Sequence, residues 1–213
     1  MKKKLISKKH FLLLMFITTF NFAFTQSETE VLRLQVGLGV NSPLGADIAP
    51  QFDAKIVNLP SVQFGLRYMF KRNLGAKLDI HYNRFSSTGT DRTFKLNYTR
   101  VNLEGVYNVS DKLKFLSARS SLMVHLGPGI SVSKPLGIYS ANNATFLNLN
   151  VGVAYEYALS KRVSLFSDFN YTHSFATKDA YDVLTDGYSF NGAMIQVSIG
   201  VSVALSGCKY CEE

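Results

Sequence analysis

The stretch Met194-Ile-Gln-Val-Ser-Ile-Gly-Val-Ser-Val-Ala-Leu205 decides the fold of this chain. Its odd-numbered positions are all aliphatic, from Ile195 to Leu205, whereas the even-numbered positions after Met194 are small or polar. An α-helix would distribute the apolar side chains around its circumference, but a β-strand puts all of them on one face. The stretch therefore predicts a strand with one apolar face and one polar face.

The same two-residue period recurs in seven earlier segments. In one of them the phase slips near Thr99 and Arg100, because Phe94, Leu96 and Tyr98 are apolar on even numbers. A β-bulge or the membrane boundary is expected at that point. The seven segments are residues 32–40, 62–70, 74–82, 94–109, 122–133, 147–157 and 163–172.

The connections between these strands alternate in length. Short turns are expected at 71–73, 110–112 and 160–162, whereas longer segments rich in Asn, Asp, Ser, Thr and Gly occupy 41–60, 86–92, 134–144 and 174–189. Outer-membrane barrels combine tilted strands of about 9–11 residues with short periplasmic turns and longer outer loops. The sequence thus predicts an all-β fold, an eight-stranded antiparallel up-and-down transmembrane β-barrel with both chain ends on the short-turn side.

The first 25 residues predict an export signal. Five lysines within the first nine positions precede an apolar run at 11–24, and the small residues Ala23 and Thr25 precede Gln26. This order is typical of a secretory signal peptide cleaved near Thr25/Gln26. The alternative, a membrane-anchoring helix, would need about 20 apolar residues. The expected organisation is a signal peptide at 1–25, a barrel at 26–205 and a periplasmic tail at 206–213.

Composition and charge exclude several classes of protein. Of the 213 residues, 46% are hydrophobic and only 18% are charged, which excludes a disordered chain and a highly charged coiled coil. The formal charge of +8 comes largely from the five N-terminal lysines, whose removal leaves 18 cations against 15 anions. This small excess predicts no nucleic-acid partner.

The apolar face of the strands is expected to contact lipid, although a soluble lipocalin-like barrel alternates in the same way. The aromatic residues of that face gather near the strand ends, as they do where a barrel meets lipid headgroups. Those near the short turns are Tyr68, Phe70, Tyr107, Tyr155 and Tyr157, and those near the longer loops are Tyr82, Phe94, Tyr98, Phe169 and Tyr171.

Ionisable side chains on the polar face define the candidate site. The interior of an eight-stranded barrel is only wide enough to be filled by side chains, and an unpaired charge there would cost several kcal/mol. We therefore expect a plug of salt bridges, in which glycines make room, rather than an open pore; the alternative is that some charges sit at solvated strand ends. The predicted lumen residues are Arg33, Arg67, Lys77, Asp79, Glu104, Arg119, Glu156 and Asp168.

Three segments, 94–109, 122–131 and 162–169, resemble the small eight-stranded barrels of outer-membrane proteins. The sequence looks most like the N-terminal barrel of OmpA-type proteins. This resemblance implies a location in the outer membrane of a Gram-negative bacterium, with outer-membrane lipid and the barrel-assembly machinery as partners. The chain departs from the OmpA-type plan because no room remains for a peptidoglycan-binding domain, and because Leu205 stands where such barrels end in an aromatic residue.

Few residues suggest catalysis or metal binding. Cys208 and Cys211 form a C-x-x-C pair that can bridge locally or serve as half of a zinc or redox site, but no further ligands lie nearby.

His173 next to Ser174 suggests acyl transfer, yet neighbours in a strand point to opposite faces. His81 and His125 are expected in the lumen. We predict no catalytic, cofactor-binding or metal-binding residues, no cofactor and no enzymatic activity.

The sequence favours a structural or interaction role, with the lumen plugged and the loops facing outside. A lipid-modifying enzyme, a narrow channel and an accessory barrel of a secretion or adhesion system are the alternatives. The sequence does not identify an extracellular or periplasmic protein partner, because fold alone does not imply function and the loops carry no recognisable binding motif.

If residues 2–24 form a cleaved signal, the mature chain begins near Gln26. Intact-mass measurement of protein extracted from the membrane should give the mass of that shortened chain. A mass that retains Met1 or Lys2 would contradict the export prediction.

Overall fold

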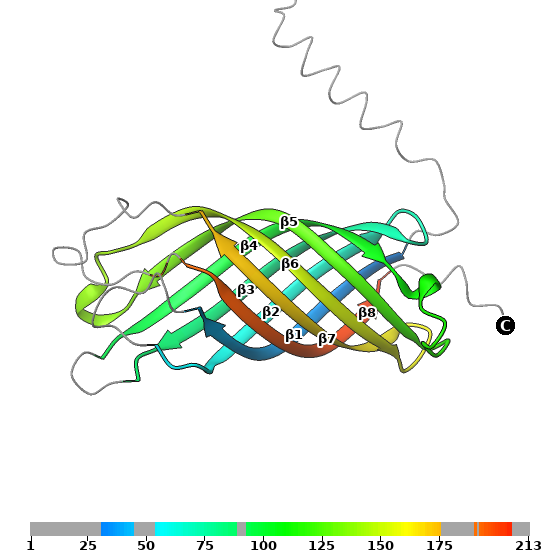
Figure 1. Cartoon of the computed structure of the whole chain (residues 1–213), viewed down its shortest axis with the longest axis horizontal. Coiled ribbons are helices and arrows are strands. Elements are labelled where there is room, and N and C mark those ends of the chain that lie inside the picture. The colour runs from blue at the N-terminus through cyan, green and yellow to red at the C-terminus, as the bar shows by residue number, and fades with distance from the viewer. Residues whose placement is uncertain (1–30, 45–53, 89–92, 176–189, 191, 206–213) are drawn as a thin grey trace, which may run out of the picture.

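The computed structural model describes residues 31–44, 54–88, 93–175, 190 and 192–205. These residues form one closed barrel of eight antiparallel strands, as the sequence predicts (Figure 1). The strands are β1 (Val31–Pro43), β2 (Asn58–Met69), β3 (Leu74–Ser86), β4 (Lys95–Asn108), β5 (Ser120–Pro135), β6 (Ala144–Ala158), β7 (Val163–Ser174) and β8 (Met194–Ala204), with short 3-10 helices η2 (Ser110–Lys112) and η3 (Gly137–Tyr139) between them.

Two predicted segments, the signal peptide at 1–25 and the tail with Cys208 and Cys211, lie outside the described residues. In the part of the chain that the structure describes, no helix is long and apolar enough to cross a lipid bilayer.

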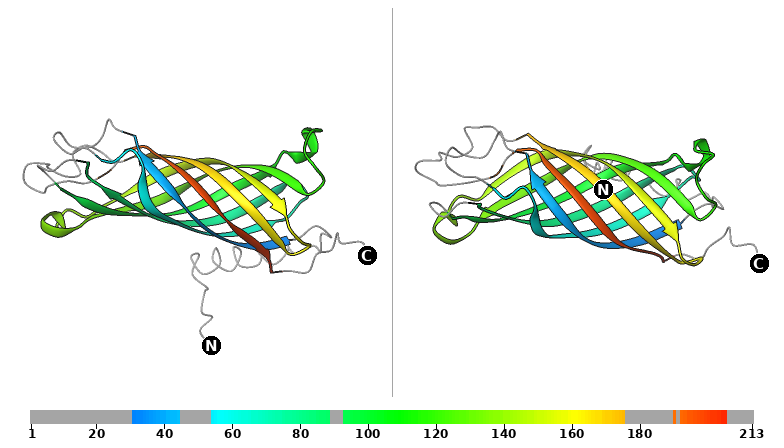
Figure 2. Two further views of the ribbon diagram at one scale, coloured as in Figure 1. Left: turned by 90° about the horizontal axis from the view of Figure 1, so that it is seen from below. Right: turned by 60° about the horizontal axis from the view of Figure 1, so that its bottom comes forward.

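The barrel closes because its first strand pairs with its last. The β1–β8 ladder runs without a break from Arg33↔Ala204 to Pro43↔Met194. Each remaining strand pairs with its neighbours in sequence, so the sheet has no free edge. Closure satisfies the backbone N–H and C=O groups that lipid cannot satisfy. Figure 2 shows the strands winding obliquely around the barrel.

Connections at one end of the barrel are on average shorter than those at the other end. The segments 70–73, 109–119 and 159–162 join strands at one end of the barrel. The first strand begins and the last strand ends there too, since Leu205 donates its backbone N–H to the carbonyl oxygen of Leu32 at 2.8 Å. The chain termini, predicted on the same side, lie outside the described residues. The segments 44–57, 87–94, 136–143 and 175–193 join strands at the other end. The predicted three-residue turn at 110–112 is wrong in length, because η2 occupies it and the connection continues to residue 119.

The apolar side chains of the strands face outward. Along β8, Val197, Ile199 and Val201 are exposed, with Ile199 at 66%, whereas Gln196 and Ser198 are buried in the lumen. Buried and exposed positions alternate in the same way along the other strands. An apolar exterior around a polar interior is the arrangement that a lipid environment stabilises.

The phase slip near Thr99 and Arg100 is not a bulge. The β3–β4 register is continuous from Leu74↔Tyr107 to Ser86↔Lys95. The apolar positions change sides instead, because Leu96 and Tyr98 point into the barrel and are fully buried. The prediction that Phe94 and Tyr98 belong to an outer aromatic belt is therefore wrong.

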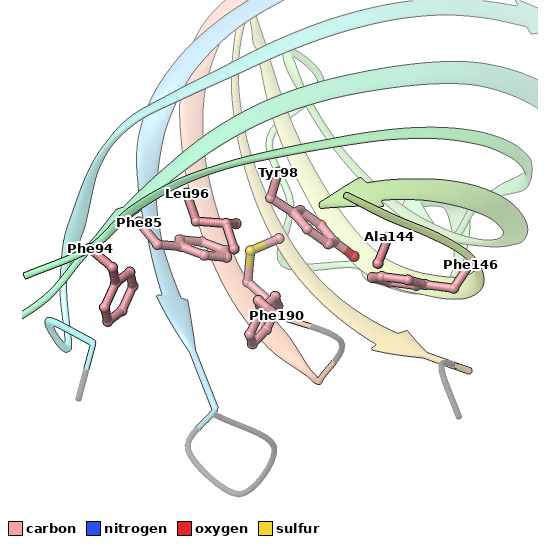
Figure 3. Close-up of a cluster of buried hydrophobic side chains, with 8 residues drawn as sticks. Phe85, Phe94, Leu96, Tyr98, Ala144, Phe146 and Phe190 are labelled. Carbon is pink, nitrogen blue, oxygen red and sulfur yellow. The ribbon is translucent and has the colours of Figure 1, made fainter. Parts of the chain in front are cut away.

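These side chains form an apolar cluster inside the loop end of the barrel (Figure 3). The ring of Phe190, from the β7–β8 connection, packs edge-on against Phe85 and Tyr98, with centroid distances of 4.9 and 5.6 Å. The Tyr98 hydroxyl is within hydrogen-bond distance of Ser131 Oγ at 2.6 Å. The cluster lies in the lumen at this end, and we call it the loop-end cluster. Its members are Phe85, Phe94, Leu96, Tyr98, Ala144, Phe146, Phe190 and Met194.

The outward position of Ile199 gives a stability prediction. Ile199→Arg should destabilise the folded barrel in liposomes by about 2–4 kcal/mol, because it puts a charge into the apolar band. Urea unfolding followed by gel shift measures this loss. The control is Ile138→Arg, since Ile138 is 88% exposed in η3, beyond the strands. Equal stability of the two variants would contradict the assigned faces.

Candidate functional site: the charged lumen

Seven of the eight predicted lumen residues line the barrel interior. They come from six strands: Arg33 on β1, Arg67 on β2, Lys77 and Asp79 on β3, Glu104 on β4, Glu156 on β6, and Asp168 on β7. All except Arg33 are at least nine-tenths buried. Arg33 lies nearer the short-turn opening, where its side chain keeps 14% exposure.

Lys77 is the centre of the network. Its Nζ lies 3.0 Å from Asp79 Oδ2, 3.2 Å from Asp168 Oδ2 and 4.0 Å from Glu104 Oε2. The three carboxylates come from β3, β7 and β4, so one ammonium group links strands across the barrel. The Lys77 side chain is only 3% exposed, so screening by water is weak and each ion pair is stronger than at a surface.

Two histidines extend this centre. His125 Nδ1 is 2.8 Å from Glu104 Oε2, and His125 Nε2 is 2.9 Å from Asp168 Oδ1. Close packing accompanies these contacts, because a Cβ at Gly152 would overlap the His125 ring. Gly152 therefore provides room for the imidazole, as expected of glycines on the lumen face.

His81 connects the ion pairs around Lys77 to Gln196 and Arg100. His81 Nε2 is 2.6 Å from Asp79 Oδ2, and its Nδ1 is 2.7 Å from the amide nitrogen of Gln196. Arg100 donates to the oxygen of the same amide at 3.2 Å, which fixes the amide orientation. His81 Nδ1 thus accepts a hydrogen bond from Gln196, and Nε2–H donates to Asp79.

A second ion-pair centre lies toward the short-turn end. Arg67 binds Glu156 through two parallel hydrogen bonds of 2.7 and 2.9 Å. Gln35 donates to the same carboxylate at 2.8 Å, and Arg33 Nη1 lies 3.9 Å away. Bidentate arginine–carboxylate pairs are strong and directional, so this contact fixes β2 against β6 across the lumen.

Arg100 is a lumen residue that the sequence prediction missed. It is fully buried and donates hydrogen bonds to Asn150 and Thr172. The alternation contained the signal, since Asn102 and Glu104 are lumen residues on the same even-numbered face. The expected bulge at Arg100 concealed it.

Arg119 is the wrong member of the predicted set. It is exposed and precedes β5, because the β4–β5 connection continues to residue 119. It lines a cavity of about 320 Å³ at the short-turn opening, together with Arg33, Arg67 and Glu156. Arg100 takes its place in the lumen, so the predicted number of four cations and four carboxylates is kept. We call the set Arg33, Arg67, Lys77, Asp79, Arg100, Glu104, Glu156 and Asp168 the lumen network.

The described residues show no cluster of three or more metal-ligating side chains. The lumen network instead pairs its carboxylates with arginine, lysine and histidine. This arrangement neutralises the charges of the buried side chains inside a narrow barrel. An apolar exterior, a closed strand ladder and a neutralised interior define an integral barrel of an outer membrane.

Comparison with known families agrees with this class. The sequence profile described as outer membrane protein beta-barrel domain matches residues 11–201, and the chain belongs to this family. No curated protein matches the sequence.

Solved barrels share the fold at low sequence identity. A major outer membrane protein from Thermus thermophilus is 10% identical with a TM-score of 0.59, covering 83% of this chain and 100% of that one. OprG from Pseudomonas aeruginosa is 12% identical with a TM-score of 0.57, covering 83% and 96%. Neisserial surface protein A is 14% identical with a TM-score of 0.54, covering 83% and 97%. Likeness at this level shows the fold alone.

The bidentate pair gives a second stability prediction. Glu156→Ala should destabilise the barrel by about 3–5 kcal/mol, because it leaves Arg67 charged and buried without its carboxylate. The matched control is Asp111→Ala, which removes a pair with Arg72 whose side chains are 45% and 76% exposed. Such a surface pair contributes about 0–1 kcal/mol. Urea unfolding in liposomes compares the two, and equal losses would contradict a dry network.

Proposed function

We propose that this protein is a closed outer-membrane barrel with a structural or interaction role, performed by the loops that it presents outside. The observation that carries the proposal is the filled lumen. The lumen network and the loop-end cluster occupy successive levels of the same interior, and all their side chains except that of Arg33 are buried.

A filled lumen disfavours the channel alternative. An ion crossing the barrel would have to pass the Lys77 centre, where the side chains of Asp79 and Glu104 are fully buried. It would also have to pass the rings of Phe85 and Tyr98, which stack at 5.8 Å. Opening either level would break ion pairs or expose apolar surface, and both cost free energy.

The geometry of the histidines supports a role without catalysis. His173 points outward from β7, whereas Ser174 is buried at 7% exposure on the opposite face. This pair therefore does not form the nucleophile and base of an acyl-transfer site. His81 and His125 are engaged by carboxylates of the lumen. We propose that the protein uses no cofactor.

The partners follow from the same proposal. We expect export through the N-terminal signal, insertion by the barrel-assembly machinery into a Gram-negative outer membrane, and contact with its lipid. An extracellular or periplasmic protein partner would be found by crosslinking in cells and capture of the full chain. Altered lipid A in a deletion strain, measured by mass spectrometry, would instead favour the lipid-modifying alternative.

Single-channel recording tests the closed lumen. The wild-type barrel in planar bilayers should show no steady conductance, because two levels of side chains close it. The double variant Phe85→Ala/Phe190→Ala should stay silent as well, since it opens only the loop-end cluster and leaves the lumen network intact. Steady conductance of the wild type would replace this proposal with the channel function.

A further inference from the structure

On the described strands, outward-facing charge is confined to one place. Among the strand residues that the structure describes, the outward-facing charged side chains are Arg84 on β3, Lys95 on β4 and Lys134 on β5. All three are cations, all lie at the loop end, and their strands are neighbours. We call them the loop-end cation patch.

The register brings these cations together. Arg84 pairs with Asn97 across β3 and β4, and Asn97 pairs with Lys134 across β4 and β5. Lys95 lies two residues from Asn97 on the same face, opposite Ser86. Since facing side chains of adjacent strands are about 5 Å apart at Cβ, the three cations occupy two adjoining rows of one surface.

The patch lies at the level where a membrane presents its headgroups. Tyr82, an aromatic residue of the outer face, precedes Arg84 by two residues on β3. Two residues of a strand tilted by about 40° rise roughly 5 Å along the barrel axis. Because longer loops mark the outer end of such barrels, the headgroups at this level belong to the outer leaflet.

Arg84 is held in position rather than free to move. Its Nε donates to Asn97 Oδ1 at 3.0 Å, and its Nη2 donates to the Tyr82 hydroxyl at 3.2 Å. Tyr82 in turn donates to Asn97 Oδ1 at 2.8 Å. A lysine or arginine whose charged group is simply solvated near a membrane interface does not require such hydrogen bonds.

The charge of the patch is not neutralised by the described residues. None of the ion pairs among them involves Arg84, Lys95 or Lys134. The described carboxylates instead lie in the lumen network or, for Asp111, in η2 at the other end.

A recess adjoins the patch. It has a volume of about 490 Å³, and its wall includes Lys95, Lys55 and the hydroxyl-bearing Ser87 as well as the apolar Leu136 and Ile138. The backbone N–H of Lys55 donates to Ser86 at 2.9 Å, which places this fourth cation beside β3. The recess thus combines cations, hydroxyl groups and an apolar side.

Building on the outer-membrane location and loop orientation of the proposed function, we propose that the loop-end cation patch binds the phosphate groups of an outer-leaflet lipid. A guanidinium fixed by Asn97 and Tyr82 suits phosphate oxygens, which arginine binds through parallel N–H groups. Lys95 and Lys134 add positive charge, and the recess accepts the rest of the headgroup. The apolar wall below the patch, including Ile80 and Val132, then faces the acyl chains of the same lipid.

The test measures lipid binding to the mature, folded barrel in detergent by native mass spectrometry. The probes are diphosphoryl lipid A and the same lipid without its phosphates. The patch variant is Arg84→Gln/Lys95→Gln/Lys134→Gln. The matched control is Lys71→Gln/Lys114→Gln/Lys161→Gln, which removes the same charge from exposed positions at the short-turn end.

Wild type and control should bind the phosphorylated lipid with equal affinity, and the patch variant should bind it roughly a hundredfold more weakly, or about fivefold per cation removed. The difference should shrink as salt is raised. Equal binding by the patch variant would overturn the proposal, as would equal affinity of the wild type for the lipid without phosphates. Displacement by inorganic phosphate at similar concentration would also overturn it, by assigning the patch to a free anion.

Gel shift confirms that each variant is folded before binding is measured. If the triple variant does not fold, Lys134→Gln alone replaces it, because Lys134 is exposed and makes no hydrogen bond with its side chain among the described residues. The expected loss is then about fivefold, with Lys114→Gln as its control.

Discussion

A lipid bilayer offers no hydrogen bonds to the backbone, and the whole structure follows from that constraint. The pairing of β1 with β8 removes the last free edge of the sheet. Once the sheet is closed, alternation has only one arrangement that lipid stabilises, with Leu38 and Ile199 outside and Gln35 and Ser198 inside. The polar interior is therefore a consequence of closing the sheet in a lipid environment.

Closure with eight strands also limits the width of the interior. Side chains must fill it, and those with charge must meet partners, because water is nearly excluded. Lys77 meets this demand by contacting carboxylates of three strands, and Arg67 meets it with one bidentate partner. Gly65 and Gly152 give up side-chain volume where these groups pass, since a Cβ at Gly65 would lie 3.0 Å from Lys77 Cε. The interior thus pairs its charged groups and leaves room for their side chains at the same positions.

The sequence predicts the strands, their faces and most of the lumen, because a two-residue period has one physical meaning in a barrel. The prediction fails where apolar residues of a strand face the barrel interior instead of lipid. Tyr98 and Leu96 look like lipid-facing residues, but they pack inside the loop-end cluster. That error hid Arg100, whose even number matches Asn102 and Glu104. Arg119 fails for another reason, since the period cannot tell a strand's first residues from the end of a long turn.

The polarity of β4 reverses along an unbroken ladder, and this reversal is informative. From Arg100 toward the short turns, polar side chains face inward and apolar ones face outward. Toward the loops, Leu96 and Tyr98 face inward while Lys95 and Asn97 face outward, as in a barrel surrounded by water. Since the β3–β4 register does not shift, the surroundings must change instead of the backbone. The membrane boundary, one of the two interpretations of the phase slip, accounts for this change. The outward cations of β3, β4 and β5 all lie on the watery side of that boundary, next to the headgroups, where their charge is tolerated and can be used.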